Sequence, residues 1–153
     1  MQPFVRTEIG KPEQWLIEAG AAIGLNFSVF IHETTNQFRD HVLNRHGDPA
    51  IHGTATVINE DFSRIPSIIQ KPDMAIIGVK RKGATYIVYV KTESNVTYLY
   101  FEQILNSRRN KALRGSTFYK VTRPLLLNEV LKNISRNDKT DLKEAKIFTR
   151  GKS

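Results

Sequence analysis

The segment TYIVYVKTESNVTYLYFEQIL, residues 85–105, consists of two runs of β-branched and aromatic residues separated by a short polar break. Val, Ile, Thr, Tyr and Phe fit the pleated surface of a sheet, so both runs are predicted to be strands. The break, residues 92–95, has the length of a hairpin connection. The two strands are therefore expected to pair antiparallel.

The same period of two extends outward from this hairpin. Residues 75–80 and 112–121 have the same composition, and residues 81–84 form another connection of hairpin length. Residues 106–111 form a longer, basic loop. The sequence therefore predicts a four-stranded antiparallel meander over residues 75–80, 85–91, 97–105 and 112–121.

The N-terminal half has helical periodicity instead. Residues 12–25 place apolar side chains at helical spacing behind Pro12, which predicts a short amphipathic helix that covers the core. A second helix is expected to be capped by Thr34 or Thr35 and to end at Gly47. Residues 54–58 are a candidate short strand. A short helix is predicted from Phe62 to residue 69, broken by Pro66.

A final helix is predicted over residues 124–135, opened by Pro124. Its buried stripe is expected to contain Leu126, Leu127, Val130, Leu131 and Ile134. Residues 1–135 are then one domain, and residues 136–153 are a polar C-terminal tail that we expect to fray. The predicted fold class is α+β, with N-terminal helices packed on the meander and a C-terminal helix added.

The composition narrows the class of function. The chain of 153 residues has 23 Lys and Arg against 15 Asp and Glu, a net charge of +8 that attracts polyanions, nucleic acid first. No cysteine is present, which excludes a disulfide framework and thiolate zinc sites. No apolar run has the roughly 20 residues of a membrane helix. A signal-peptide pattern is also absent from the N-terminus, so export would depend on something outside the chain.

Four histidines fall within residues 32–52, and the segment from His41 to Asp48 reads HVLNRHGD. Imidazole can accept and donate protons near neutral pH, which makes this cluster the main indication of chemistry. Helical spacing directs His46 toward the core or a cleft in it and His41 toward another side. The alternative is that a histidine at a helix end only satisfies the last carbonyls, and His52 is expected in a solvated loop.

Three polar residues stand on the predicted central strands: Lys91, Glu102 and Thr117. Burying a charge costs free energy unless the charge has a partner or a function. These residues are therefore predicted to line one patch of the sheet that faces the His46 helix. The alternative is a cross-strand ion pair between Lys91 and Glu102 on a solvated face.

At this point the sequence resembles the phage and toxin-associated nucleases of the barnase, EndoU, colicin and RelE superfamily. The resemblance covers roughly residues 15–121 and is carried by segments in the expected order: Trp15, EAG at 18–20, His32, HVLNRHGD at 41–48, DFSRIPSII at 61–69, KPD at 71–73, IVYVK at 87–91, YFE at 100–102 and TFY at 117–119. The helix end His46-Gly47-Asp48 and the segment IPSII are fairly specific together.

The resemblance implies an α+β fold with an endoribonuclease or tRNase site between helix and sheet. It assigns catalysis to His46 with His41 nearby, and to Lys91, Glu102, Thr117 and Tyr119. It also implies an RNA partner, with tRNA as a candidate, and an inhibitor or immunity protein as a candidate partner. Action in the bacterial cytoplasm, after delivery by phage or a secretion system, is implied in the same way.

Metal-independent transesterification, with no cofactor, fits these residue types. The 2′-hydroxyl attacks phosphorus and leaves a 2′,3′-cyclic phosphate, while one group takes a proton and another protonates the leaving 5′ oxygen. We expect His46 and Glu102 to share the proton transfers, and the helix end mildly favours His46 as the acid. Lys91 would offset phosphoryl charge, and Thr117 and Tyr119 would donate hydrogen bonds.

RNA contact is predicted for a run of cations that contains no acid: Arg108, Arg109, Lys111, Arg114, Lys120 and Arg123. Tyr98, Tyr100 or Tyr119 could stack an unpaired base. The alternatives are a solvated loop for the run and ordinary sheet packing for the tyrosines.

Two other classes of function compete with a nuclease. The first is a non-catalytic nucleic-acid-binding or virion-associated module on the same fold, which would use the basic run and ignore the histidines. The second is a metal hydrolase, which is disfavoured because His41 and His46 are five positions apart instead of four. Phosphate-loop and dinucleotide-binding motifs are absent from the sequence.

Overall fold

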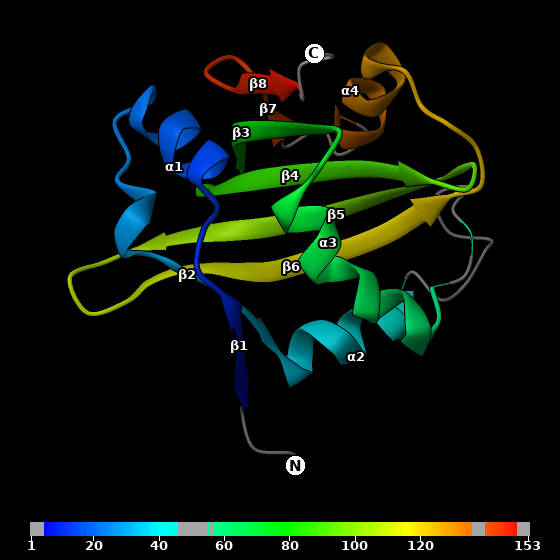
Figure 1. Ribbon diagram of the computed structural model, residues 1–153, viewed down its shortest axis with the longest axis horizontal. Helices are drawn as coiled ribbons and strands as arrows, with labels where there is room; N and C mark the ends of the chain where they lie inside the picture. Colours follow the sequence, from blue (N-terminus) through cyan, green and yellow to red (C-terminus); the bar gives the residue numbers. More distant parts are fainter. Residues whose placement is uncertain (1–4, 46–54, 56, 136–139, 150–153) are drawn as a thin grey trace.

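A computed structural model describes residues 5–45, 55, 57–135 and 140–149 of the chain (Figure 1). These residues form one mixed sheet in the order β1-β2-β6-β5-β4-β3-β7, with β8 also paired to β3. The strands are β1 (Arg6–Gly10), β2 (Ile31–Thr35), β3 (Met74–Arg81), β4 (Ala84–Glu93), β5 (Val96–Asn106), β6 (Lys111–Val121), β7 (Thr140–Asp141) and β8 (Lys146–Thr149).

The predicted meander is confirmed as β3 to β6, which pair antiparallel in sequence order. Both hairpin turns place two residues at positive φ, Lys82 and Gly83 in one and Ser94 and Asn95 in the other. Two such residues define the turn whose twist matches that of paired strands.

The expectation of a sheet with only four strands is wrong. β2 adds to β6 in parallel, with Glu33 opposite Arg114, and β1 adds to β2 antiparallel. These strands continue the sheet past β6 (Figure 1).

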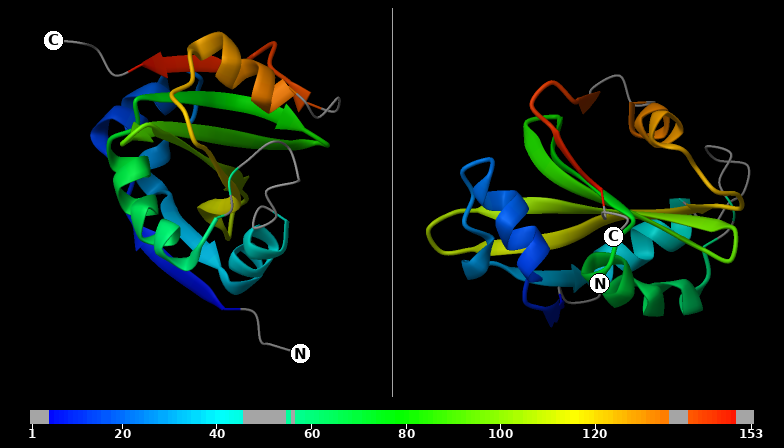
Figure 2. Two further views of the ribbon diagram at one scale, coloured as in Figure 1. Left: turned by 90° about the vertical axis from the view of Figure 1, so that its right-hand side faces the viewer. Right: turned by 45° about the horizontal axis from the view of Figure 1, so that its top comes forward.

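Helices cover both faces of the sheet (Figure 2). Face A, as we name it, is covered by α1 (Gln14–Ala21), α2 (Asn36–Arg45) and α3 (Ile65–Gln70), with the 3-10 segments η1 (Phe27–Val29) and η2 (Asn59–Arg64). Face B is covered by α4 (Leu127–Ser135) and by the connection between β7 and β8. Each face buries its own apolar cluster, as expected for a sheet whose two sides both carry apolar residues.

The N-terminal helices agree with the prediction in position. The predicted end of the second helix at Gly47 lies outside the described residues. The Thr35 hydroxyl accepts a hydrogen bond from the Phe38 backbone amide at 3.1 Å, which confirms a threonine cap on α2. Pro12 precedes α1 without entering it. Pro66 stands in the first turn of α3, where a missing N–H costs nothing, so it starts this helix instead of breaking it. The predicted strand at 54–58 is observed as a single bridge from Ala55 to Lys120.

The C-terminal helix is confirmed, but its predicted stripe is partly wrong. Val130 and Ile134 are buried, whereas Leu126 precedes the helix and is 71% exposed. Leu127 is also exposed. The Glu129 carboxylate accepts a hydrogen bond from the Leu126 backbone amide at 3.0 Å and caps the first turn of the helix.

A frayed tail is also wrong for residues 140–149. β7 and β8 pair with β3, which would otherwise be an open edge. Phe148 of β8 stacks on Trp15 of α1 with ring centroids 4.7 Å apart, which fixes the end of the chain to the N-terminal helix. No helix in the described ranges is long and apolar enough to cross a membrane.

Candidate functional site

Four polar residues form a continuous row across face B. Glu33 of β2 is opposite Arg114 of β6, which is opposite Gln103 of β5, which is opposite Tyr86 of β4. Cross-strand partners share a face, so these four side chains lie side by side. We call Glu33, Arg114, Gln103 and Tyr86 the polar row.

A bulge in β6 adds two more polar residues to the same face. The register slips between Phe101, which is opposite Thr117, and Glu102, which is opposite Gly115. Residues 114 and 117 would point to opposite faces of a regular strand because they are three positions apart. The extra residue brings Thr117, and Tyr119 two positions later, to the face that carries Arg114.

The centre of the row is an ion pair. Arg114 Nε donates to Glu33 Oε2 at 2.7 Å, and the two side chains are 26% and 11% exposed. This pair is sheltered enough to hold a fixed geometry, yet solvent reaches it. A guanidinium that is partly exposed to solvent is of the kind that binds phosphate groups.

A second cation borders the row. The Arg81 guanidinium lies 5.2 Å from the centroid of Phe101, the residue opposite Thr117. Its Nε donates to Thr140 Oγ1 at 3.1 Å, so β7 holds it in place. The polar row together with Arg81, Thr117 and Tyr119 is called the face B site below. It combines a carboxylate, two guanidinium groups, hydroxyls and an amide.

Two predicted catalytic residues lie elsewhere, on face A. Lys91 is opposite Tyr98, which is four residues along β5 from Glu102 and so about 13 Å away. The Lys91 ammonium donates to the Lys71 carbonyl at 2.6 Å, at the end of α3. The patch predicted to hold Lys91, Glu102 and Thr117 together is therefore wrong, and so is the alternative ion pair.

Glu102 belongs to a fully buried polar network. Its Oε2 is 2.7 Å from His32 Nδ1, and its Oε1 accepts a hydrogen bond from the Tyr89 hydroxyl at 2.6 Å. Burial, and then the neighbouring Glu102 carboxylate, raise the pKa of Tyr89 and of Tyr100 well above the usual tyrosine value. Both phenols thus stay protonated, and Tyr89 remains a hydrogen-bond donor.

Of the other predicted histidines, the structure describes His41. His41 is exposed on α2, on the side away from the buried Phe38 and Val42, as the helical spacing predicted. His46 and His52 lie outside the described residues.

The predicted RNA-binding run divides between the two faces. Arg114 is in the polar row, whereas Lys120 is on face A and pairs with Asp61 at 2.8 Å. Lys111 donates to Asn106 at 2.8 Å. Arg108 and Arg109 are exposed in the β5–β6 turn, which is closed by hydrogen bonds between Ser107 and Asn110.

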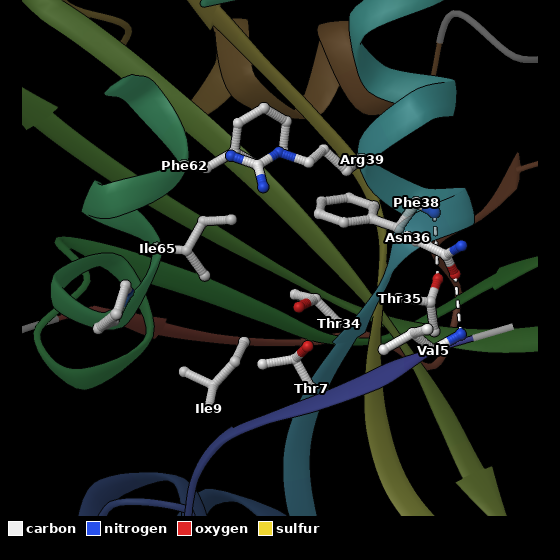
Figure 3. Close-up of a pocket in the computed structure, with 11 residues that line it drawn as sticks. Val5, Thr7, Ile9, Thr34, Thr35, Asn36, Phe38, Arg39, Phe62 and Ile65 are labelled. Atoms are coloured by element: carbon white, nitrogen blue, oxygen red, sulfur yellow. Dashed lines mark hydrogen bonds between the residues drawn. The ribbon is translucent and has the colours of Figure 1, made fainter. Parts of the chain in front are cut away.

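A pocket of about 290 Å³ opens on face A (Figure 3). Phe38, Phe62 and Ile65 form apolar walls, Thr7 and Thr34 line one side, and Arg39 lies over the Phe62 ring. None of the described residues that line the pocket is a carboxylate or a histidine. It therefore offers no ordinary proton-transfer group, and the face B site is the better candidate for chemistry.

Sequence reasoning missed Glu33, Arg81, Gln103 and Tyr86. Gln103 and Tyr86 were detectable because they lie on predicted strands and on one face with Arg114. Glu33 was not, because it enters the site through the parallel pairing of β2 with β6, which joins segments about 80 residues apart.

Comparison with known proteins gives one match. A family model described as phage-Barnase-EndoU-ColicinE5/D-RelE like nuclease3 matches residues 10–128. No curated protein and no solved structure matches the chain. The matched span contains every residue of the face B site.

Proposed function

Because the chain belongs to the phage-Barnase-EndoU-ColicinE5/D-RelE like nuclease3 family, we propose that it is an endoribonuclease whose active site is the face B site. The family itself indicates a nuclease. Cleavage of RNA, the metal-independent mechanism and the roles of individual residues are the content of the proposal.

The observation that carries the proposal is the partly exposed ion pair between Glu33 and Arg114. A base and a phosphate-binding cation are held 2.7 Å apart, with the Arg114 side chain 26% exposed and the Glu33 side chain 11% exposed. In the reaction, Glu33 accepts the proton of the RNA 2′-hydroxyl as its oxygen attacks the adjacent phosphorus. The bond to the 5′ oxygen breaks, and a 2′,3′-cyclic phosphate forms.

The remaining residues act on the phosphate. Arg114 and Arg81 stabilise negative charge on the phosphoryl oxygens, and Thr117 and Tyr119 donate hydrogen bonds to them. His46, which follows the last residue of α2 in the sequence, is proposed to protonate the leaving 5′ oxygen. This role comes from the sequence, where a helix end favours the protonated form.

RNA is proposed as the substrate, with tRNA as a candidate, because the mechanism needs a 2′-hydroxyl. Arg108 and Arg109 are proposed to hold the RNA backbone beyond the cleaved bond. An inhibitor protein as partner and action in the bacterial cytoplasm belong to the same proposal, supported by the family.

The test compares three substrates of one sequence: RNA, DNA and RNA with 2′-O-methyl groups, each with and without excess EDTA. We expect cleavage of unmodified RNA only, in the presence of EDTA, with cyclic phosphate at the new 3′ ends. Cleavage of DNA or of methylated RNA would overturn the mechanism. Binding of RNA without any cleavage would favour the non-catalytic binding module.

A further inference from the structure

We infer that the buried pair His32–Glu102 is a positioning device for the face B site, an inference that rests on the proposed function. The pair lies on face A, behind the polar row on face B. Its effect on the row passes through the backbone of three strands.

The positions of the two residues carry the inference. His32 precedes Glu33 on β2, and Glu102 precedes Gln103 on β5. β6 lies between these strands and supplies Arg114. The 2.7 Å contact between His32 and Glu102 thus ties β2 to β5 across β6, directly behind the point where Glu33, Arg114 and Gln103 meet.

A gap in the side chains of β6 makes this contact possible. Gly115 is the residue opposite Glu102, and a Cβ there would stand 2.6 Å from the Tyr100 hydroxyl. Since no side chain rises from Gly115, the imidazole of β2 and the carboxylate of β5 can meet over the intervening strand.

Stability alone does not account for the pair. Both side chains are at most 1% exposed, and replacing a buried polar pair with apolar residues of similar volume is often neutral or stabilising. His32 Nε2 also has no hydrogen-bond partner within the described part of the chain, which adds to the cost of burial. What the pair supplies is one fixed register between β2 and β5, and with it the geometry of the row.

The test uses two variants of His32 and a matched control. His32→Leu removes the contact, whereas His32→Asn keeps a donor near the position of Nδ1. Tyr98→Phe is the control, because the Tyr98 ring is 4% exposed in the apolar cluster of face A, where it cannot stack an unpaired base. The variant removes only a hydroxyl that contacts Asp61, away from the row. Circular dichroism and urea unfolding identify conditions in which all variants are folded.

We expect His32→Leu to lower the single-turnover cleavage rate at saturating RNA by about 100-fold, because a small misplacement of catalytic groups has effects of that size. RNA affinity should change by less than about threefold, since Arg108 and Arg109 are untouched. His32→Asn should recover most of the rate, and Tyr98→Phe should leave it unchanged. An equal loss in His32→Leu and Tyr98→Phe would overturn the inference.

A second readout does not depend on activity. The Arg114 Nε–H group, which donates to Glu33, can be followed by hydrogen exchange in NMR spectra of labelled protein. We expect its exchange to become at least about tenfold faster in His32→Leu and to stay unchanged in Tyr98→Phe. If the wild type cleaves no RNA, the proposed function fails, while unchanged exchange in His32→Leu would refute the positioning role by itself.

Discussion

Glu33 and Glu102 stand on neighbouring parts of one sheet, and their surroundings give them different roles. Glu102 is fully buried and its two oxygens are occupied by His32 and Tyr89. Glu33 is partly exposed and pairs with Arg114, a cation that a phosphate can also bind. A carboxylate that acts on RNA needs access, and the Glu33 side chain is 11% exposed whereas that of Glu102 is 0% exposed.

Glu33→Gln should therefore abolish cleavage. The amide cannot take the 2′ proton, and loss of a general base lowers rates by roughly 10²–10⁴-fold. The matched control is Glu93→Gln, which breaks the ion pair with Arg64 away from the face B site. Single-turnover rates at saturating RNA, with folding checked by circular dichroism, give the comparison. Retained cleavage in Glu33→Gln would remove Glu33 from the mechanism.

Tyr89 should make the protein sensitive to alkali. Its pKa is raised by burial and then by the Glu102 carboxylate, so the folded state keeps a proton that the unfolded state releases near pH 10. The unfolded state then binds fewer protons, and the free energy of unfolding falls as pH rises above about 10. The contribution of Tyr89 to this fall is about 1.4 kcal/mol per pH unit.

Urea unfolding of the wild type and of Tyr89→Phe between pH 8 and pH 11 measures this contribution. The variant should be less stable at pH 8, because Glu102 loses a donor, and should lose less stability above pH 10. Parallel pH profiles for the two proteins would show that Tyr89 does not keep its proton in the folded state.

Among the elements, those with local pairing were predictable and those with distant partners were not. β3 to β6 follow one another through short turns, so composition and period located them within one or two residues. β2 is a strand of five residues with four polar side chains, and its partner β6 is far away in sequence. Because β2 was not predicted, the position of Glu33 in the candidate site was not predicted either.

The bulge in β6 could not be predicted from the sequence either. Strict alternation from Arg114 would put Thr117 on face A, and the predicted patch assumed that it joined Lys91 and Glu102 there. The extra residue moves Thr117 and Tyr119 to face B, so two of the four predicted catalytic residues on strands remain in the candidate site, and Lys91 and Glu102 do not. A shift of one residue exchanges the faces of every later side chain in a strand.

Gly115→Ala tests the bulge as an element. The added Cβ would stand 2.6 Å from the Tyr100 hydroxyl and 3.3 Å from Thr34 Cγ2, so the Tyr100 side chain or the strands must shift. We expect a loss of about 1–3 kcal/mol in the free energy of unfolding, the range for an overpacked core, together with slower RNA cleavage.

Two further variants show whether the added Cβ causes the loss of stability. Gly10→Ala is the control, because a Cβ there meets nothing within 4 Å, and its stability should match the wild type. Adding Tyr100→Phe to Gly115→Ala removes the obstructing hydroxyl and should restore part of the lost stability. If Gly115→Ala is as stable as Gly10→Ala, β6 does not need a glycine at this position.

In the whole molecule, the main structural core and the proposed active site lie on opposite faces of the sheet. Face A carries the larger apolar cluster, the buried network of Glu102 and the helices α1, α2 and α3, whereas the face B site lies beside the smaller cluster under α4. The net charge of +8 draws polyanions to the whole surface, so it cannot by itself distinguish a binding track from scattered charge.

Arg108 and Arg109 are the cations that the structure presents most openly near Arg114. They stand at the tip of the β5–β6 turn, and the strand β6 leads from this tip directly to the polar row. Replacing both by alanine should weaken RNA binding whatever the sequence, because phosphate contacts carry no base information. The slope of log affinity against log salt should fall by roughly 0.7 for each lost contact with single-stranded RNA.

The control removes the same amount of charge from another place. Lys80→Ala with Lys143→Ala lowers the net charge by two on the side of β3 and β7, where both side chains are exposed. Affinity at several salt concentrations and the single-turnover rate at saturating RNA are measured for both double variants. The arginine variant should bind more weakly and still cleave at nearly the wild-type rate once saturated, because the face B site is intact. Equal weakening in both double variants would mean that RNA responds to total charge and that the β5–β6 turn is not a binding track.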